Sequence, residues 1–146
     1  MSQKESWRTR KYWSKKGGLL IEEFVVVKRT KTTGIRLIDG IIVLGEESRI
    51  YDGNFYDLED KDVIVIQTKE NRIGMGLLGQ AYLSTLLIAK LNPRSIKSVA
   101  ICGKNDDVIG QLAKDHNVEV IVMGDENYDE KFDNPKYIEK NKSLYS

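Results

Sequence analysis

The hydrophobic and polar positions of the chain predict one α/β domain with five strands and three helices. Short runs rich in Val, Ile and Leu predict strands at Leu19–Lys28, Ile35–Leu44, Val63–Thr68, Lys97–Cys102 and Val118–Met123. Helical composition and capping residues predict helices at Glu5–Lys16, Gly74–Leu91 and Asp106–His116. We expect residues 1–124 to form a mixed central sheet flanked by helices. Asp125–Ser146 then forms a polar, loose tail.

The connections between these elements predict how the strands pair. The turn Arg29–Gly34 is too short for a crossover, so the strands on either side of it form an antiparallel hairpin. If the turn centres near residues 31 and 32, Asp39 lies opposite Phe24 or Val25. Either Glu22 or Glu23 then shares its face, and a slip of one residue decides which. The last two strands, with a helix between them, are expected to be parallel.

Two stretches outside the regular strands have their own expectations. Gly45–Lys61 is acidic and rich in turn residues, which predicts a surface excursion with a small hairpin through Arg49–Tyr56. The helix Gly74–Leu91 is apolar nearly all round, so we expect it to be central or to lie at a subunit interface. A homodimer through this helix or the tail follows from that pattern.

Three polar residues stand on strands that are otherwise apolar. Asp39 lies on the second strand, and Gln67 and Lys69 lie at the end of the third. Because alternate residues of a strand share a face, Gln67 and Lys69 emerge side by side while Thr68 points the other way. The sequence therefore predicts that a carboxylate, an amide and an ammonium group are brought together.

Composition narrows the chemistry that this site can support. Charged residues make up 31% and hydrophobic residues 40%, with no apolar run long enough to span a bilayer. The polar, basic N-terminus is not a secretory signal, so we expect a cytoplasmic protein. Cys102 is the only cysteine and reads as a small buried hydrophobe, and His116 is the only histidine. A metal ion would therefore be a hard one bound by oxygen.

The net charge of +1 hides an asymmetry along the chain. Residues 1–36 contain ten Lys or Arg and three acids, whereas residues 37–69 contain eight acids and three bases. A basic arm beside an acidic pocket suits a metal-dependent enzyme that acts on a polyanion. Solvated charge on an exposed helix and loops is the alternative interpretation.

The order helix, three strands, helix, strand, with Asp39 on the second strand and Gln67-Thr68-Lys69 on the third, resembles the PD-(D/E)XK nuclease superfamily. Similar members include the Holliday-junction resolvases and the Mrr-type nucleases. The resemblance covers about residues 5–123 and implies a restriction-endonuclease-like core. It also implies a Mg²⁺- or Mn²⁺-dependent deoxyribonuclease, which we expect to be an endonuclease, because members of this fold mostly cut DNA. It implies that Asp39 binds the metal and that Lys69 orients or activates the attacking water.

The chain departs from this family's pattern at its second acid, where Gln67 stands in place of Asp or Glu, as in Mrr-like members. An amide oxygen and the backbone carbonyl of Thr68 still ligate Mg²⁺, although more weakly than a carboxylate. The metal then needs another carboxylate, from Glu23 or Glu22 on the first strand. Glu5 matches the first-helix glutamate of the resolvases and is a further candidate.

Several other polar residues are candidates for contacts with nucleic acid. Cations interleaved with aromatics between residues 4 and 16 are typical of such a surface, although an ordinary amphipathic helix has the same composition. Gln80 lies near where RecB-like nucleases place a glutamine. The candidates are Lys11, Arg29, Lys31, Arg72 and Gln80.

Two other functions remain open. A nucleic-acid-binding module with the nuclease fold and a weak or inactive site is the main alternative, because Gln67 removes one charge from the metal site. The pattern Gly74-x-Gly76-x-x-Gly79 has the spelling of a dinucleotide fingerprint. The region after it has no acid at the usual distance, which disfavours a dinucleotide-binding domain.

Overall fold

The computed structural model describes the backbone of residues 3–133 and the side chains from residue 6 onward. Its elements follow the predicted order, with one additional short strand and two short 3-10 helices. They are α1 (Gln3–Lys16), β1 (Leu19–Val27), β2 (Arg36–Val43), β3 (Arg49–Ile50), β4 (Asp62–Arg72), α2 (Met75–Ala89), β5 (Ser95–Lys104), α3 (Asp107–Asp115), β6 (Val118–Val122), η1 (Asp125–Asn127) and η2 (Glu130–Asp133).

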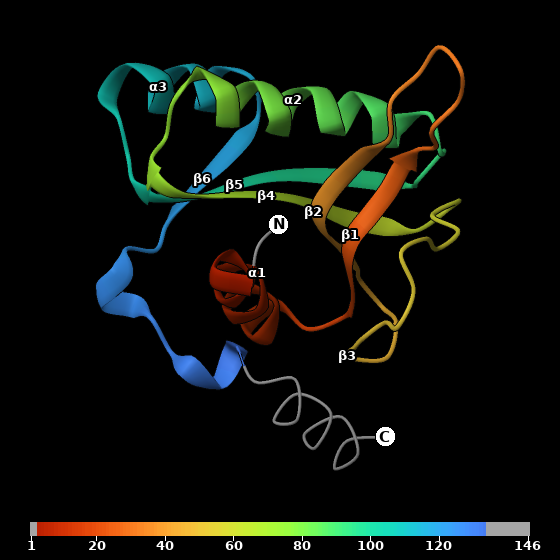
Figure 1. Cartoon of the computed structure of the whole chain (residues 1–146), viewed down its shortest axis with the longest axis horizontal. Coiled ribbons are helices and arrows are strands. Elements are labelled where there is room, and N and C mark those ends of the chain that lie inside the picture. The colour runs from red at the N-terminus through yellow and green to blue at the C-terminus, as the bar shows by residue number, and fades with distance from the viewer. Residues whose placement is uncertain (1–2, 134–146) are drawn as a thin grey trace.

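The strands form one mixed sheet in the order β3-β1-β2-β4-β5-β6. β1, β2 and β4 pair antiparallel, whereas β4, β5 and β6 pair parallel. Helix α1 covers one face of the sheet, and α2 and α3 cover the other (Figure 1). The predicted α/β class with a mixed sheet between helices is confirmed.

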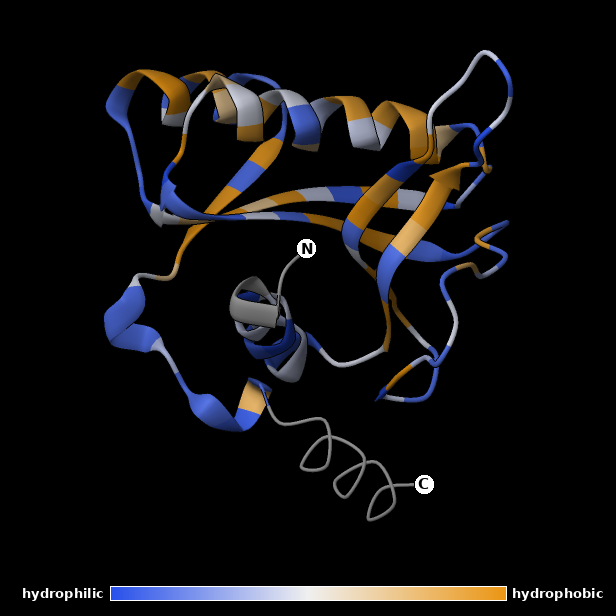
Figure 2. Ribbon diagram, viewed as in Figure 1, coloured by the Kyte–Doolittle hydropathy of each residue, from blue (hydrophilic) through white to orange (hydrophobic). Residues whose placement is uncertain are grey.

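Apolar clusters on both faces hold the layers together. Trp7 and Tyr12 of α1 pack with Ile64 and Ile66 of β4. On the other face, Ile88 of α2 packs with apolar residues of β1, β2 and β4. The hydrophobic colour of the central strands in Figure 2 corresponds to these two buried layers. β4 is apolar on both faces, as expected for a strand that is covered on both sides.

Gly40 allows α1 to approach the sheet closely. A Cβ atom on Gly40 would lie 2.8 Å from Cγ2 of Thr9, which is fully buried on α1. The missing side chain of Gly40 therefore faces α1.

The register of the first hairpin differs by one residue from the prediction. The pairs Glu22–Gly40 and Phe24–Ile38 flank Asp39, so Asp39 lies across from Glu23 rather than Phe24 or Val25. An irregularity between Val25 and Val27 shifts the pairing near the turn. A register counted from the centre of the turn could not include this shift.

Two connecting segments also differ from the prediction. The small hairpin through Arg49–Tyr56 is wrong, because only Arg49 and Ile50 form a strand, which pairs parallel with β1. After β6, residues 125–133 pack on α1 instead of lying loose. Phe132 is buried in the cluster with Trp7, and its carbonyl accepts a 2.8 Å hydrogen bond from Arg10 Nη1. Residues 134–146 of the expected tail lie outside the described residues, and the boundary at residue 124 stays a prediction.

Candidate active site

Asp39 and Thr68 meet where the ladder between β2 and β4 ends. The last pair of this ladder is Gly40–Ile66. Beyond it, the backbone N–H of Thr68 donates a 2.9 Å hydrogen bond to Oδ2 of Asp39, and the Thr68 hydroxyl lies 3.4 Å from the same oxygen. The N–H and C=O of one strand residue point to the same side, so the carbonyl of Thr68 also faces the β2 edge. The carboxylate and this carbonyl are thus directed to one region.

Gln67 is a buried amide with a partner at each end. Its side-chain Nε2 donates a 2.8 Å hydrogen bond to the Ser84 hydroxyl on α2. Its Oε1 accepts a longer bond, 3.4 Å, from the backbone N–H of Asp39. Because a buried polar group needs its hydrogen bonds, the two contacts fix the amide orientation. Ser84 therefore positions the oxygen of Gln67 beside Asp39.

Lys69 follows on the same strand and is exposed. Gln67 pairs with Ala100 and Lys69 with Cys102, and both partners belong to the cluster under α2 and α3. Paired residues on adjacent strands project to the same side of a sheet. The position of Lys69 is accordingly on the side to which Gln67 points, as the alternation predicts. Its ammonium group makes no hydrogen bond or ion pair with the described residues.

The three candidate glutamates are in different situations. Both oxygens of Glu22 accept 3.0 Å hydrogen bonds from Arg10 of α1, which directs this carboxylate to the face opposite Gln67. Glu23 lies across from Asp39, and its φ of 50° places it in the left-handed region. The side chain of Glu5 lies outside the described residues. Of the two strand glutamates, Glu23 is thus the one whose backbone adjoins Asp39.

The oxygen donors around Asp39 are of the chemical types that bind a hard divalent cation. A carboxylate, an amide oxygen and a backbone carbonyl are all ligand types that Mg²⁺ and Mn²⁺ accept. Among the described residues, however, no three His, Cys, Asp or Glu side chains are grouped closely enough to hold a metal ion. Asp39 supplies the one formal charge of this donor set, and a carboxylate from Glu23 would add a second. The expected Mg²⁺ or Mn²⁺ cofactor stays a prediction.

The candidate nucleic-acid contacts are spread over several elements. Arg29 and Lys31 are exposed on the loop between β1 and β2, and Gln80 is exposed on α2. Lys11 is bound to the neighbouring segment, since its Nζ donates a 2.6 Å hydrogen bond to the carbonyl of Asn127. Arg72 ends β4, three residues beyond Lys69.

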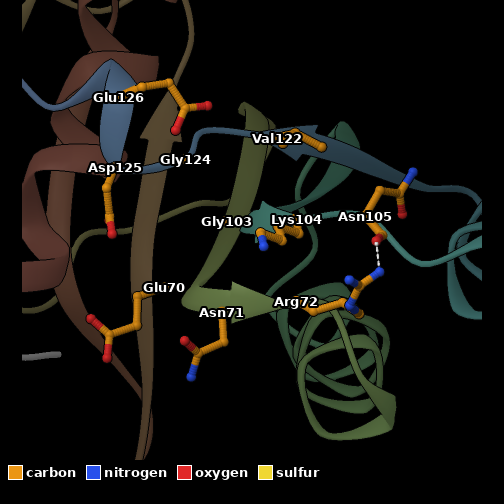
Figure 3. A pocket seen from close by; sticks show the side chains of 10 residues that line it. All are labelled: Glu70, Asn71, Arg72, Gly103, Lys104, Asn105, Val122, Gly124, Asp125 and Glu126. Carbon is orange, nitrogen blue, oxygen red and sulfur yellow. Dashed lines mark hydrogen bonds between the residues drawn. The ribbon is translucent and has the colours of Figure 1, made fainter.

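Arg72 also lines a cavity of about 710 Å³ at the carboxyl ends of β4, β5 and β6. Its Nη1 donates a 3.1 Å hydrogen bond to the carbonyl of Asn105. In Figure 3, Glu70 and Asp125 lie on one side of the cavity, and Arg72 and Asn105 lie on the other. The cavity therefore offers a cationic side and an anionic side rather than one uniform charge.

The structure gives roles to two residues that the sequence analysis did not predict. Ser84 belongs to the buried stripe of α2, with Leu77, Ala81 and Ile88, and a polar residue in such a stripe indicates a hydrogen-bond partner beneath it. Arg8 is one of the cations between residues 4 and 16 whose pattern predicts a nucleic-acid surface. That prediction is wrong for Arg8, because the residue is only 1% exposed. Its Nε donates a 2.8 Å hydrogen bond to the carbonyl of Met123. That partner is 115 residues away, so no local pattern indicates it.

The single cysteine has no catalytic geometry. Cys102 is fully buried on β5, and burial raises the pKa of its thiol. A raised pKa disfavours the reactive thiolate. The expectation that Cys102 is a small buried hydrophobe is confirmed.

None of the described helices is long and apolar enough to cross a membrane, and the cytoplasmic location stays a prediction.

Comparisons with known proteins add little to this geometry. No protein-family model matches the sequence, and no curated protein matches it. The chain is similar to a solved structure described as "Structure of EndoMS-dsDNA2 complex", with 11% sequence identity and a TM-score of 0.49. The match covers 80% of this chain and 43% of the chain in that structure, so this protein spans less than half the length of the matched chain. At these values the similarity supports no argument about function.

Proposed function

We propose that the protein is a Mg²⁺- or Mn²⁺-dependent endonuclease that hydrolyses phosphodiester bonds in DNA. The observation that carries the proposal is the hydrogen bond from the backbone of Thr68 to the carboxylate of Asp39, which brings the aspartate to the Gln67-Thr68-Lys69 triplet. Support for DNA as the substrate comes from the resemblance of this arrangement to the PD-(D/E)XK nucleases.

The residues at the site have distinct tasks in this chemistry. When bound, a divalent cation neutralises charge on the phosphoryl oxygens and lowers the pKa of a coordinated water. Asp39, Gln67 Oε1 and the Thr68 carbonyl would hold it, with Glu23, whose backbone lies across from Asp39, as the candidate for a further carboxylate. Lys69 supplies a positive charge beside the phosphoryl group, which opposes the negative charge that builds up in the transition state. Ser84 keeps the amide of Gln67 oriented toward Asp39.

Cations outside the site provide sequence-independent affinity for a polyanion. The loop between β1 and β2 presents Arg29 and Lys31, together with the exposed Lys28 and Arg36 that flank them. This loop extends beyond the ends of both strands (Figure 1). Contacts of Lys and Arg with phosphates fix the register of a nucleic acid without reading its sequence. The loop is therefore suited to hold DNA next to Asp39, which lies three residues into β2.

The decisive experiment is cleavage of labelled single-stranded, duplex and branched DNAs in Mn²⁺. We compare the wild type with Lys69→Ala and with Lys114→Ala, which removes an exposed lysine of α3. Cleavage by the wild type and Lys114→Ala, reduced about a hundredfold or more in Lys69→Ala, is the expected result. Equal cleavage by all three proteins would indicate a contaminating nuclease and overturn the proposal.

A second candidate is a nucleic-acid-binding module with an inactive site. Gln67 favours it, because the amide is held at both ends and provides no charge to a metal. DNA binding without cleavage, together with absence of calorimetric Mn²⁺ binding, would select this function.

The third candidate, a dinucleotide-binding domain, has weaker support. Gly74, Gly76 and Gly79 have no atom within 4 Å of the place where a Cβ would stand, so no neighbouring backbone requires them.

A further inference from the structure

Helix α2 has an apolar face that the rest of the described chain does not cover. The helix contains no charged residue along its 15 positions. The sheet buries only the stripe of Leu77, Ala81, Ser84 and Ile88. On the opposite side Met75 is 79% exposed, Leu83 58% and Leu86 48%. A helix that is apolar all round is normally buried all round, and α2 is buried on one side only. Figure 2 shows hydrophobic colour along much of α2.

The exposed face continues onto α3. The ring of Tyr82 contacts the ring of His116 at the end of α3, with centroids 5.5 Å apart. Beyond this contact, Val108 and Leu112 of α3 are also exposed. We call Met75, Tyr82, Leu83, Leu86, Val108 and Leu112 the outer patch. Contiguous exposed apolar surface of this kind marks an interaction site on a soluble protein.

The protruding side chains and the gaps of the outer patch lie at matching distances on either side of the middle of α2. Gly79 has open space above it, and Leu83 projects one turn further along the helix. Met75 and Leu86 lie at similar distances on either side of Ala81. When two copies of α2 are placed antiparallel, crossing at the level of Ala81 along the helix but through the outer face, Leu83 of each lies over Gly79 of the other, and Met75 lies near Leu86. The face is thus complementary to itself, which an isologous interface requires.

We propose that α2 packs through the outer patch against the α2 of a second copy of this chain, antiparallel, around a two-fold axis that crosses the helix midway between Gly79 and Leu83. The absence of charge on α2 favours a second copy over a charged partner, because two copies meet without repulsion and a charged partner finds no opposite charge. A helix of 15 residues is about 22 Å long and about 10 Å wide, whereas a stable interface buries about 800 Å² on each side. Val108 and Leu112 of α3 therefore belong to the interface as well.

The pairing reaches the candidate active site through one side chain. Ser84 lies on the sheet side of α2 and holds the amide of Gln67. Packing of the outer patch fixes the helix that positions this amide. The dimer itself does not depend on the proposed nuclease activity, and it is measured without metal or DNA.

The test is sedimentation velocity of the full chain over a range of concentrations. We compare the wild type with Leu83→Glu, with Gly79→Leu, which fills the gap that receives Leu83, and with Leu37→Glu. Leu37 is 45% exposed on β2, outside the outer patch, and is the matched control. We expect a dimer for the wild type and for Leu37→Glu. The dissociation constant should rise about a hundredfold or more in Leu83→Glu, since two buried carboxylates enter each dimer.

Three results would overturn the proposal. The first is a wild type that stays monomeric at every concentration. The second is a dimer that neither Leu83→Glu nor Gly79→Leu weakens, with circular dichroism showing that the variants are folded. The third is a monomer that floats with phosphatidylcholine vesicles and loses this binding in Leu83→Glu, because the outer patch would then bind a lipid surface.

Discussion

The backbone N–H of Thr68 donates a 2.9 Å hydrogen bond to the carboxylate of Asp39, at the point where the β2–β4 ladder stops. This bond has two consequences that can be measured separately. It satisfies a backbone donor that has lost its strand partner, and it places a negative charge next to the Gln67-Thr68-Lys69 triplet. A structural role depends on the acceptor oxygen, whereas a role in metal binding depends on the charge.

Substitutions of Asp39 distinguish these roles. Asp39→Asn keeps an oxygen for the Thr68 N–H and removes the charge, so its thermal unfolding should stay close to that of the wild type. Asp39→Ala removes the acceptor and should cost about 1–2 kcal/mol of stability. Both variants should lose Mn²⁺ binding in calorimetry and reduce DNA cleavage about a hundredfold or more. Asp52→Asn, at an exposed loop position, is the control. Full activity in Asp39→Asn would show that the carboxylate only terminates the ladder.

Gln67→Glu tests whether the amide limits the metal site. A carboxylate at this position adds a second charge next to Asp39, so the dissociation constant for Mn²⁺ should fall about tenfold. Without metal, two neighbouring carboxylates repel each other, and the variant should melt at a lower temperature than the wild type. Mn²⁺ should reverse this loss. Calorimetry and thermal melts with and without Mn²⁺ measure both effects. Unchanged Mn²⁺ affinity would mean that residue 67 is not a ligand.

The loop between β1 and β2 is expected to contribute affinity for DNA without contributing to catalysis. The double substitution Arg29→Ala and Lys31→Ala should weaken binding to all duplex sequences alike. It should also lower the slope of log affinity against log salt by about two, because each phosphate contact contributes about 0.9. Fluorescence anisotropy in EDTA at several salt concentrations measures this slope. The control replaces Lys90 and Lys114, which are exposed near the ends of α2 and α3. A slope that changes equally in both proteins would remove the loop from the binding surface.

Local pattern was enough to predict the elements because each of them is covered on a definite face. The first half of β4 is apolar on both faces, so it appears in the sequence as the apolar run Val63–Ile66. Helix α2 appears as a long stretch without any charged residue. The positions of Asp39, Gln67 and Thr68 followed from strand order and from alternation. The predicted hairpin register was one residue off because the irregularity between Val25 and Val27 has no signature in residue type.

Contacts between distant segments could not be predicted in this way. Arg8 is an ordinary helix cation by sequence, but its guanidinium is buried against Met123 and Asp125. Phe132 lies among charged residues and still joins the core under α1. Each case depends on a partner more than 100 residues away, so composition alone predicts exposure for both. The segment after β6 completes the α1 layer of the fold.

Gly40 is expected to be the glycine at which an added methyl group costs most under α1. The Cβ of Gly40→Ala would lie 2.8 Å from Cγ2 of Thr9, whose side chain is fully buried and has little space to move. Forcing an extra methyl group into such a contact costs about 1–3 kcal/mol. Chemical denaturation measures the loss. In Gly79→Ala the new Cβ meets open space, so that variant should be as stable as the wild type or more stable. Equal stability of both variants would show that α1 can move away from the sheet.

The start of β4 should make the stability of the fold depend on acid. Arg94 and Ser95 donate hydrogen bonds to Asp62, and they lower the pKa of its carboxyl from 3.8 to about 2. Because the folded state binds this proton less tightly than the unfolded state, the contribution is complete above pH 3.8 and is lost as the pH falls toward 2. Asp62→Asn should therefore be less stable than the wild type at neutral pH, with the difference shrinking across that acidic interval. Urea unfolding at neutral pH and at several acidic pH values measures this convergence. The effect is small because the pair is exposed to solvent. A difference that stays constant down to pH 2 would mean that Asp62 stabilises the fold by packing rather than by its charge.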